Sequence, residues 1–370
     1  MNYSLFTSES VCAGHPDKVC DQISDAVVDA AIKLYPKSRV ACESLVTGGK
    51  IVLAGEVTCP LPINFEEIAR NKVKELGYIK KELGFNYKAD VEVYIHRQSP
   101  DIALGVDDGG AGDQGMMFGY ACDETKNLMP LPITLAHELC RQMDELHSKY
   151  SWLRPDGKSE VAVNYEKGRP VSVEKIVLAK PINYKEIGSD EAKDILYEQA
   201  IKPIMDKYKM NLIIKDQVIF NGTGKWEIGG PASDTGVTGR KIVVDTYGGM
   251  ARIGGGCFSG KDTTKVDRSA AYAARLIAKN IVAAGLARRC EVQLAYAIGV
   301  RDPIAKAVET FGTATKDQKV ISDFAWELLD LSVEGINTGL NLRQPIYQKT
   351  AAYGHFGNPL YPWEKLSISS

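Results

Sequence analysis

The sequence contains no apolar run near the roughly 18 residues that a membrane-spanning helix requires. Its most apolar predicted helix, residues 264–282, is interrupted by Arg275 and Lys279. Residues 1–10 have neither the basic region nor the apolar segment of a secretory signal peptide. We therefore expect no membrane association and no secretion, and a cytoplasmic location.

An excess of basic residues is also absent. The 370 residues include 45 Lys and Arg and 47 Asp and Glu, which gives a formal net charge of −2. Proteins that bind nucleic acids usually present a basic face, so we expect no nucleic-acid partner. Hydrophobic residues make up 44 % of the chain, enough for a sizeable core, and the length suits two or three domains.

Paired-cysteine motifs and protease-type metal motifs are missing as well. The chain has eight cysteines but no C-x-x-C pair, and its histidines do not form H-E-x-x-H. Reduced thiols are therefore favoured over disulfides or a zinc site. There is also no G-x-S-x-G, no protein-kinase signature set and no evident Cys–His pair. These absences favour a reaction that depends on substrate positioning and charge stabilisation.

Hydrophobic periodicity predicts helices that alternate with hairpins. A helix should begin at Pro16, with Val19 and Ile23 on its apolar face and three aspartates on the other. Residues 39–46 and 50–58 should form a hairpin with a two-residue glycine turn. Further helices are expected at 64–76, 132–150, 190–208, 264–282 and 322–331, and further strands at 91–98, 160–165, 171–179, 211–220, 241–247 and 291–300. This order favours α+β layers over a doubly wound parallel sheet.

The most informative stretch is the glycine-rich segment at residues 254–262. Gly255, Gly260 and Lys261 match the G-x-x-x-x-G-K part of a phosphate-binding loop, and the helix predicted to follow adds a positive dipole end. The next residue is Asp262, where a Walker A loop has the Ser or Thr that holds magnesium. The predicted upstream strand also ends too far back. We therefore expect a polyphosphate-type loop that is not a Walker A loop.

Two smaller groups of polar residues each allow two interpretations. His15, Asp17 and Lys18 lie at the start of the first helix, where Asp17 either complements the helix dipole or joins the others in a phosphate and magnesium site. Glu43 and Glu56 should lie diagonally on one face of the first hairpin. Either that face is solvated, or a cation or a ligand ammonium meets the two charges.

Two further segments combine glycines with charge. Residues 110–115 match G-x-G-x-x-G, but no strand leads into them, so a mobile loop ending in a binding turn is favoured over a dinucleotide site. Trp226, beside Lys225, suits either stacking on a base or simple burial. The second half also gathers charges that suit a chain of phosphates with magnesium, at Asp234, Arg240, Lys241, Asp245, Lys261, Lys265 and Asp267.

Together these motifs resemble the S-adenosylmethionine synthetase (methionine adenosyltransferase) family over essentially the whole chain. Residues 110–115 and 254–262 correspond to the two family signatures, and residues 14–18, 98–102 and 245–249 add further matches. The resemblance implies that the sulfur of L-methionine attacks C5′ of ATP and expels tripolyphosphate, which is then hydrolysed to phosphate and diphosphate. A neutral thioether needs no general base, which agrees with the missing nucleophile–base pair.

The resemblance also implies roles for individual residues. The catalytic set comprises His15, Lys18, Arg240 and Lys261. ATP contacts are expected at His15, Asp156, Lys158, Lys225, Trp226, Asp234, Arg240, Lys241, Cys257 and Lys261. Methionine contacts are expected at Glu56, Gln98, Asp113, Asp234 and Lys265. Two Mg2+ ions per site would be held by Asp17 and Asp267, and a K+ ion by Glu43.

The implied fold is α+β, with three similar layered domains related by a pseudo-threefold axis. We expect an N-terminal domain at 1–98, a mobile active-site loop at 99–110, a central domain at 111–229 and a C-terminal domain at 230–370. The implied assembly is a dimer of dimers, a homotetramer, with active sites at the dimer interface. Two features depart from the family pattern: the loop after Asp101 is several residues shorter than in many members, and Cys257 replaces the usual Ala.

From the residues alone, two rival functions remain. A phosphotransferase built on the glycine-rich loop is the rival enzyme, and it would leave ADP, whereas adenosyl transfer removes all three phosphates from C5′. A non-catalytic nucleotide-binding subunit is the rival outside enzymes, and it would bind ATP without turnover. The subunit is disfavoured because His15 and all the candidate metal carboxylates are present.

Overall fold

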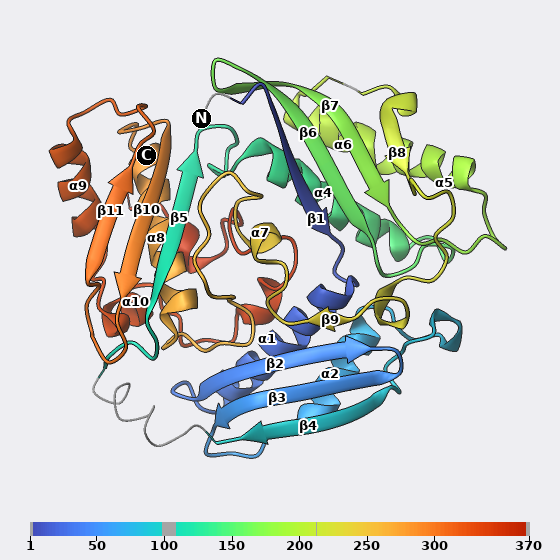
Figure 1. Ribbon diagram of the computed structural model, residues 1–370, viewed down its shortest axis with the longest axis horizontal. Helices are drawn as coiled ribbons and strands as arrows, with labels where there is room; N and C mark the ends of the chain where they lie inside the picture. Colours follow the sequence, from blue (N-terminus) through green and yellow to red (C-terminus); the bar gives the residue numbers. More distant parts are fainter. Residues whose placement is uncertain (1–2, 98–108, 212, 368–370) are drawn as a thin grey trace.

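The computed structural model describes residues 3–97, 109–211 and 213–367, and three β-sheets organise this part of the chain (Figure 1). The first sheet has the order β4-β3-β2-β9, with β2 Arg39–Thr47, β3 Lys50–Thr58, β4 Asp90–His96 and β9 Gly236–Val237. The second has the order β1-β6-β7-β8, with β1 Leu5–Val11, β6 Lys158–Glu166, β7 Arg169–Ala179 and β8 Val218–Phe220. The third has the order β11-β10-β5, with β5 Gly115–Cys122, β10 Arg289–Tyr296 and β11 Ala305–Glu309.

Helices lie between and beside these sheets, so the expected α+β architecture is confirmed (Figure 1). The helices are α1 Pro16–Leu34, α2 Phe65–Glu75, α4 Leu131–His147, α5 Ser189–Leu196, α6 Lys202–Tyr208, α7 Ile242–Asp245, α8 Val266–Ala283, α9 Gln318–Glu327 and α10 Val333–Gly339. A π-helical turn, Tyr197–Ile201, joins α5 to α6. None of the helices in the described residues has both the length and the apolar character needed to cross a membrane.

Each sheet takes one strand from a distant part of the chain. β1 pairs with β6, β9 pairs with β2, and β5 pairs with β10, all in antiparallel register. The largest cluster of buried hydrophobic side chains likewise has members from all three sheets. Segments far apart in sequence therefore share one core.

The first hairpin has the register expected from its glycine turn. Gly48 adopts a positive φ of 50°, Glu43 lies opposite Ala54, and Ala41 lies opposite Glu56. α1 and α2 pack on one face of this sheet, and the other face carries the two glutamates. The hairpin thus delivers Glu43 and Glu56 to a face that no part of the described chain buries.

α1 is the central helix of the site and is buried on almost all sides. Pro16 occupies its first turn and His15 is its N-cap residue, as the sequence pattern indicates. The polar face is buried as well as the apolar one, because β9 and the segment around Tyr347 pack against it. The aspartates of that face therefore require partners inside the protein.

Residues 241–247 were expected to form a strand, and this prediction is wrong. Residues 242–245 form the short helix α7, in which the Asp245 N–H donates to the Lys241 carbonyl at 2.8 Å, and Gly248 then turns with φ of 63°. The β-branched run favours a strand, but α7 lies between the sheets, where tertiary packing overrides that preference (Figure 1).

Other expected boundaries also need correction. The strand expected at 211–220 is reduced to β8, because a 3₁₀ turn at Lys215–Gln217 precedes it. The helix expected at 322–331 is α9, which begins and ends earlier. β5 was missed because glycines interrupt its pattern. A Cβ on Gly119 would lie 2.0 Å from the carbonyl carbon of Ala274, so the glycine allows α8 to pack directly on β5.

Candidate active site

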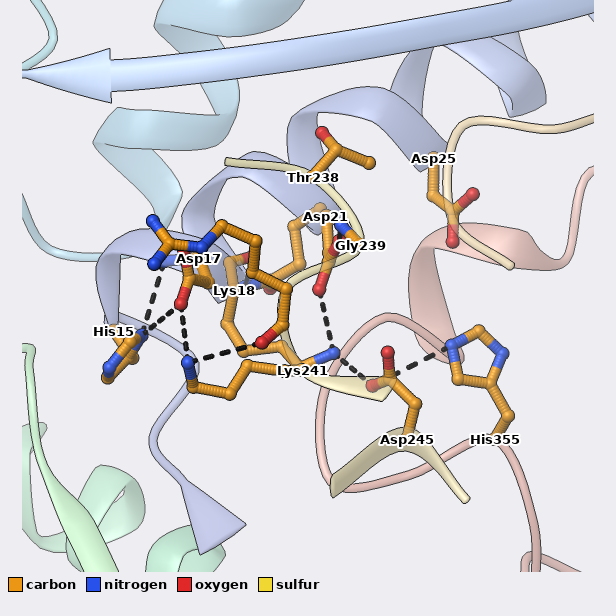
Figure 2. A network of polar contacts seen from close by, with 12 residues as sticks. His15, Asp17, Lys18, Asp21, Asp25, Thr238, Gly239, Lys241, Asp245 and His355 are labelled. Atoms are coloured by element: carbon orange, nitrogen blue, oxygen red, sulfur yellow. Dashed lines mark hydrogen bonds and ion pairs between the residues drawn. The ribbon is translucent and has the colours of Figure 1, made fainter. Parts of the chain in front are cut away.

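Two loops from the second half of the chain dock on the same edge of β2. In the first loop, residues 234–241, the Thr238 N–H donates to the Ser44 carbonyl at 3.0 Å. In the second, residues 254–262, the carbonyl of Gly260 accepts from the Cys42 N–H at 2.9 Å. The N-terminal end of α1 lies beside the first loop (Figure 2). The start of α1 and the loops 234–241 and 254–262, three of the segments predicted to form the site, therefore lie together.

His15 caps α1 through its ring. The Nδ1 atom accepts a hydrogen bond from the Asp17 N–H at 3.2 Å, so the ring proton resides on Nε2. Burial, together with the charges of Lys241 and Lys158, lowers the pKa of His15 to about 3, although Asp17 opposes the shift. His15 is therefore neutral near pH 7 and offers an N–H donor.

Asp17 is held by the first loop and by Lys241, a candidate phosphate-binding lysine. Its Oδ1 accepts from the Val237 N–H at 2.9 Å, and its Oδ2 pairs with the ammonium of Lys241 (Figure 2). Burial alone would raise the pKa of Asp17, but the hydrogen bonds from Lys241 and Val237 and the nearby charge of Lys241 together outweigh it, and the pKa lies below its usual value. Asp17 is therefore ionised and paired.

Lys18 does not join this group. Its side chain is 0 % exposed and its Nζ binds Asp21 Oδ2 at 2.9 Å and also the carboxylate of Asp245 (Figure 2). Burial would lower the pKa of Lys18, but the two carboxylates raise it above its usual value. The expectation that Lys18 meets a phosphate does not fit this arrangement, because both partners hold its ammonium inside the protein. Lys18 instead fastens α1 to α7.

The second loop carries another lysine–carboxylate pair. Lys261 Nζ lies 2.8 Å from Asp267 Oδ2, and the two side chains keep 19 % and 14 % of their exposure. Burial opposes the charge of Lys261, but Asp267 and, more weakly, Glu43 raise its pKa. Lys265 pairs instead with Asp262, 2.5 Å away, so it is engaged within its own turn.

Asp156 is a buried clamp between two segments. Its Oδ1 accepts from the Gly157 N–H and its Oδ2 from the Gly230 N–H, both at 2.7 Å, and burial raises its pKa. Lys158, two residues on, is exposed but lies near enough to His15 to lower its pKa. Asp156 thus positions the chain around Lys158 and Gly230.

Trp226 is half-buried rather than enclosed. Its indole Nε1 donates to the Ile228 carbonyl at 3.0 Å, and its backbone N–H donates to the hydroxyl of Tyr184, also at 3.0 Å. Lys225 is exposed, with its Nζ 5.6 Å from the centre of the Tyr184 ring. Complete burial, one of the two interpretations of Trp226, is therefore excluded.

The remaining predicted residues lie on the surface of this single chain. Glu43, Asp113, Asp234 and Arg240 are exposed, and Glu56 is partly exposed, with His96 Nε2 3.8 Å from its carboxylate. Gln98, and residues 99–108 of the expected loop, lie outside the described residues. The face of the first hairpin is accordingly open in the part of the single chain that the structure describes.

Cys257 connects the two loops. A Cβ on Gly239 would lie 2.7 Å from the Cys257 sulfur, so only glycine allows this approach. Burial raises the pKa of the Cys257 thiol although Lys261 opposes the shift. The thiol is therefore mostly protonated at neutral pH, which slows the alkylation or oxidation that its position would otherwise invite.

Sequence reasoning missed the residues that hold the loops in place. Asp21 accepts from the Gly239 N–H, Asp25 accepts from the Gly260 N–H, and Arg268 pairs with Asp25 through two hydrogen bonds. All three side chains are 0 % exposed. The only signal in the sequence is the regular four-residue spacing of the aspartates in α1.

Glycine-rich loops, lysines and carboxylates gathered in this way are typical of sites that bind polyphosphates. Comparison with known proteins shows which family of polyphosphate-binding proteins this chain resembles. Models of the N-terminal, central and C-terminal domains of S-adenosylmethionine synthetase match residues 3–100, 108–226 and 228–365. An S-adenosylmethionine synthase of Treponema denticola is 50 % identical over 378 residues, which cover 99 % of this chain and 96 % of the relative.

The chain therefore belongs to the S-adenosylmethionine synthetase family. This confirms the family, the transferase class and the three-domain fold type expected from the motifs. The individual site residues and the exact segment boundaries stay predictions.

Proposed function

We propose that the protein forms S-adenosylmethionine from ATP and L-methionine and then hydrolyses the tripolyphosphate to phosphate and diphosphate. One observation carries this proposal beyond family membership. Lys241 and Lys261, one from each docked loop, are each paired with a carboxylate expected to ligate magnesium, Asp17 and Asp267. The same four side chains suit a polyphosphate with its metal ions.

The two lysine–carboxylate pairs explain how charge is balanced both without substrate and with a polyphosphate bound. Without substrate, each partly buried lysine is neutralised by its own carboxylate, so both lysine charges are paired. When a polyphosphate binds, the ammonium groups turn to phosphate oxygens and the carboxylates become free for a metal. The exchange conserves ion pairs, and this makes binding of the charged substrate possible without large desolvation losses.

The donor set fits Mg2+ that is bound jointly with a substrate. Among the described residues, no three His, Cys, Asp or Glu side chains are grouped to hold a metal by themselves. Mg2+ is commonly held by one or two carboxylates together with substrate phosphates and water, and Asp17 and Asp267 supply such carboxylates. Magnesium would supply positive charge where the tripolyphosphate leaves. Glu43 is the proposed ligand of K+.

The proposed catalytic roles follow from the negative charge that develops on the leaving tripolyphosphate. The methionine sulfur attacks C5′, the C5′–O5′ bond breaks, and the electron pair leaves with O5′ of the tripolyphosphate. Neutral His15 donates its Nε2–H to the oxygen that gains charge, and Arg240 and Lys261 stabilise the leaving group. Lys18, proposed from sequence as catalytic, acts from the interior through α1. No proton has to be removed from the sulfur.

The other expected contacts remain part of the proposal. The adenosine and phosphates of ATP would meet Asp156, Lys158, Lys225, Trp226, Asp234, Lys241 and Cys257, and methionine would meet Glu56, Gln98, Asp113, Asp234 and Lys265. In the single chain Asp113 and Asp234 are exposed and Glu56 is partly exposed. A complete site is therefore expected to need a second copy.

We propose that this second copy covers the open face of the first sheet. Besides Glu43 and Glu56, the face carries partly exposed apolar side chains, and Tyr94 keeps 62 % of its exposure. Covering it would bring the glutamates beside the loops of another copy, and two such dimers would form the tetramer. The cytoplasmic location, the mobile loop at 99–110 and the boundaries near 98 and 230 also stay proposals.

A phosphorus NMR time course with ATP, L-methionine, Mg2+ and K+ tests the function. We expect phosphate and diphosphate to appear together, without ADP, and only when methionine is present. ADP as the product would return the glycine-rich loop to a phosphotransferase role. Nucleotide binding without any new phosphorus signal would instead favour the non-catalytic subunit.

A further inference from the structure

Four aspartates recur at every fourth residue of α1 and therefore share one side of the helix. Asp17, Asp21, Asp25 and Asp29 are all buried, with at most 6 % of their surface exposed. We call this set the aspartate row. Figure 2 shows its first three members, of which Asp17 and Asp21 lie beside the loop of Gly239 and Lys241. A stripe of buried carboxylates is costly unless each one is fully hydrogen-bonded.

Every member of the aspartate row accepts backbone N–H groups from the second half of the chain. The donors are Val237 for Asp17 at 2.9 Å, Gly239 for Asp21 at 2.8 Å, Gly260 for Asp25 at 2.9 Å, and Tyr347 and Gln348 for Asp29 at 2.9 and 3.0 Å. These residues lie in three segments that are separate in sequence. One helix face thus determines where three loops lie.

Two of these donors come directly before candidate phosphate-binding side chains. Gly239 precedes Arg240 and Lys241, and Gly260 precedes Lys261. Both glycines have positive φ, 79° and 83°, and a Cβ on Gly260 would lie 2.1 Å from the Cys42 carbonyl oxygen. The backbone at these points is therefore fixed by contacts on both sides.

The carboxylates are also anchored from behind. Asp21 pairs with Lys18, and Asp25 accepts hydrogen bonds from both terminal guanidinium nitrogens of Arg268, at 2.6 and 2.8 Å. Paired in this way, the acceptor oxygens have little freedom to move. The row therefore acts as a fixed template to which the glycine amides dock.

We propose that Asp21 and Asp25 are positioning residues for the reaction proposed above, on which this inference rests. Asp21 places Arg240 and Lys241 through Gly239, and Asp25 places Lys261 through Gly260. Neither aspartate touches the substrate. A misplacement of about 1 Å can reduce the rate of an enzyme reaction about 10²-fold, so loss of one amide contact should reach the chemistry.

Asp29 provides a matched control on the same helix. It is buried and accepts two backbone amides, as the other members of the row accept theirs, but its donors are Tyr347 and Gln348. Neither donor has a proposed contact with ATP, methionine or a metal. Replacing Asp29 should therefore lower stability without misplacing a phosphate-binding lysine.

The test compares Asp21→Ala, Asp21→Asn and Asp29→Ala by kcat, KM and melting temperature. We expect Asp21→Ala to lose about 10²-fold in kcat and Asp29→Ala to stay within about 3-fold for the folded fraction, although both melt earlier. Asp21→Asn, which keeps one acceptor oxygen for the Gly239 amide, should lose less than Asp21→Ala. Equal losses in Asp21→Ala and Asp29→Ala would overturn the proposal.

Hydrogen exchange gives a readout that does not depend on turnover. In the wild-type protein without substrate, peptides covering 236–241 and 257–262 should exchange about as slowly as α1. In Asp21→Ala only the 236–241 peptide should become fast, and in Asp25→Asn only 257–262. Fast exchange of both peptides in the wild type, or a uniform increase in exchange across the variants, would reject the proposal that the aspartate row orders the two loops.

The wild-type measurements also separate the two proposals. If the wild type makes no S-adenosylmethionine, the proposed function fails, whereas the exchange data still decide whether the aspartate row orders the loops. If the wild type turns over and Asp21→Ala does so equally well, only the positioning role fails. If Asp21→Ala does not fold, the wild-type exchange and the Asp21→Asn kinetics decide whether Asp21 has the positioning role.

Discussion

Asp262 and Val40 bind each other reciprocally. The Val40 N–H donates to Asp262 Oδ2 at 2.7 Å, and the Asp262 N–H donates to the Val40 carbonyl at 3.0 Å. Asp262 Oδ1 also accepts from the Thr264 N–H at 2.9 Å, just before α8. The residue that replaces the Walker A Ser or Thr thus docks the glycine-rich loop on β2 and orders the turn into the helix.

Asp262→Thr should therefore weaken the fold rather than create a kinase. A hydroxyl cannot reach both amides or neutralise Lys265, and a buried donor without an acceptor costs about 1–3 kcal/mol of unfolding free energy. Urea unfolding measures the loss, and Asp262→Asn, which keeps one acceptor oxygen, should lose less. Unchanged stability, or ADP among the products, would contradict this account of Asp262.

Two neighbouring glycines of the same loop should respond very differently to alanine. A Cβ on Gly256 would lie 2.0 Å from Asp267 Oδ1, whereas a Cβ on Gly255 has no neighbour within 4 Å. Gly256→Ala should push Asp267 from its place and lower the apparent affinity for Mg2+ and kcat, by about 10-fold or more. Magnesium titrations of activity compare the variants. Gly255→Ala should resemble the wild type, and similar defects in both would count against the role of Asp267.

Lys261→Ala should reduce the rate far more than the stability. The Lys261–Asp267 pair lies between an exposed pair, which adds about 0–1 kcal/mol to stability, and a fully buried pair, which costs about 3–5 kcal/mol to break, so a moderate loss of stability is expected. Loss of a group that stabilises transition-state charge costs about 10²–10³-fold in kcat. Lys279→Ala is the control, because Lys279 binds buried Glu364 away from the loops and should lower the melting temperature while keeping turnover. A comparable melting loss in Lys261→Ala with normal turnover would make Lys261 a structural lysine.

His137 should make the protein less stable in acid. Burial, with the charges of Arg141 and Lys18, lowers the pKa of His137 to about 3, while the unfolded chain takes up the proton near pH 6.5. Stability from this group is thus complete above about pH 6.5 and falls as the pH drops toward 3. Between pH 7.5 and 5.5 the wild type should lose roughly 1 kcal/mol more than His137→Gln.

Urea unfolding at the two pH values checks the His137 prediction. Burial raises the pKa of Asp245 to about 7, so that carboxyl contributes with the opposite sign, gaining protons in the folded state as the pH falls. Asp245 is present in both proteins, and its contribution cancels in the comparison. Equal pH dependence of wild type and His137→Gln would show that His137 is not buried neutral.

Local patterns were sufficient where neighbours in sequence decide the structure. The start of α1 follows from Pro16 and apolar spacing, and the diagonal placement of Glu43 and Glu56 follows from a two-residue turn. The family followed from motifs that are short and continuous. α7 could not be predicted, because its β-branched residues favour a strand and only its surroundings make it helical.

The sequence by itself determined the amphipathic helices, the first hairpin, the glycine-rich loops and the family, because each depends on residues close together in the chain. Only the tertiary structure decided that Lys18 lies inside the protein, bound to Asp245, and that the aspartates of α1 receive amides more than 200 positions away. In a sequence, aspartates at four-residue spacing look the same whether their side of the helix is solvated or buried. Which of the two applies depends on the segments that pack against the helix, and those are brought there by the shared core of the three sheets.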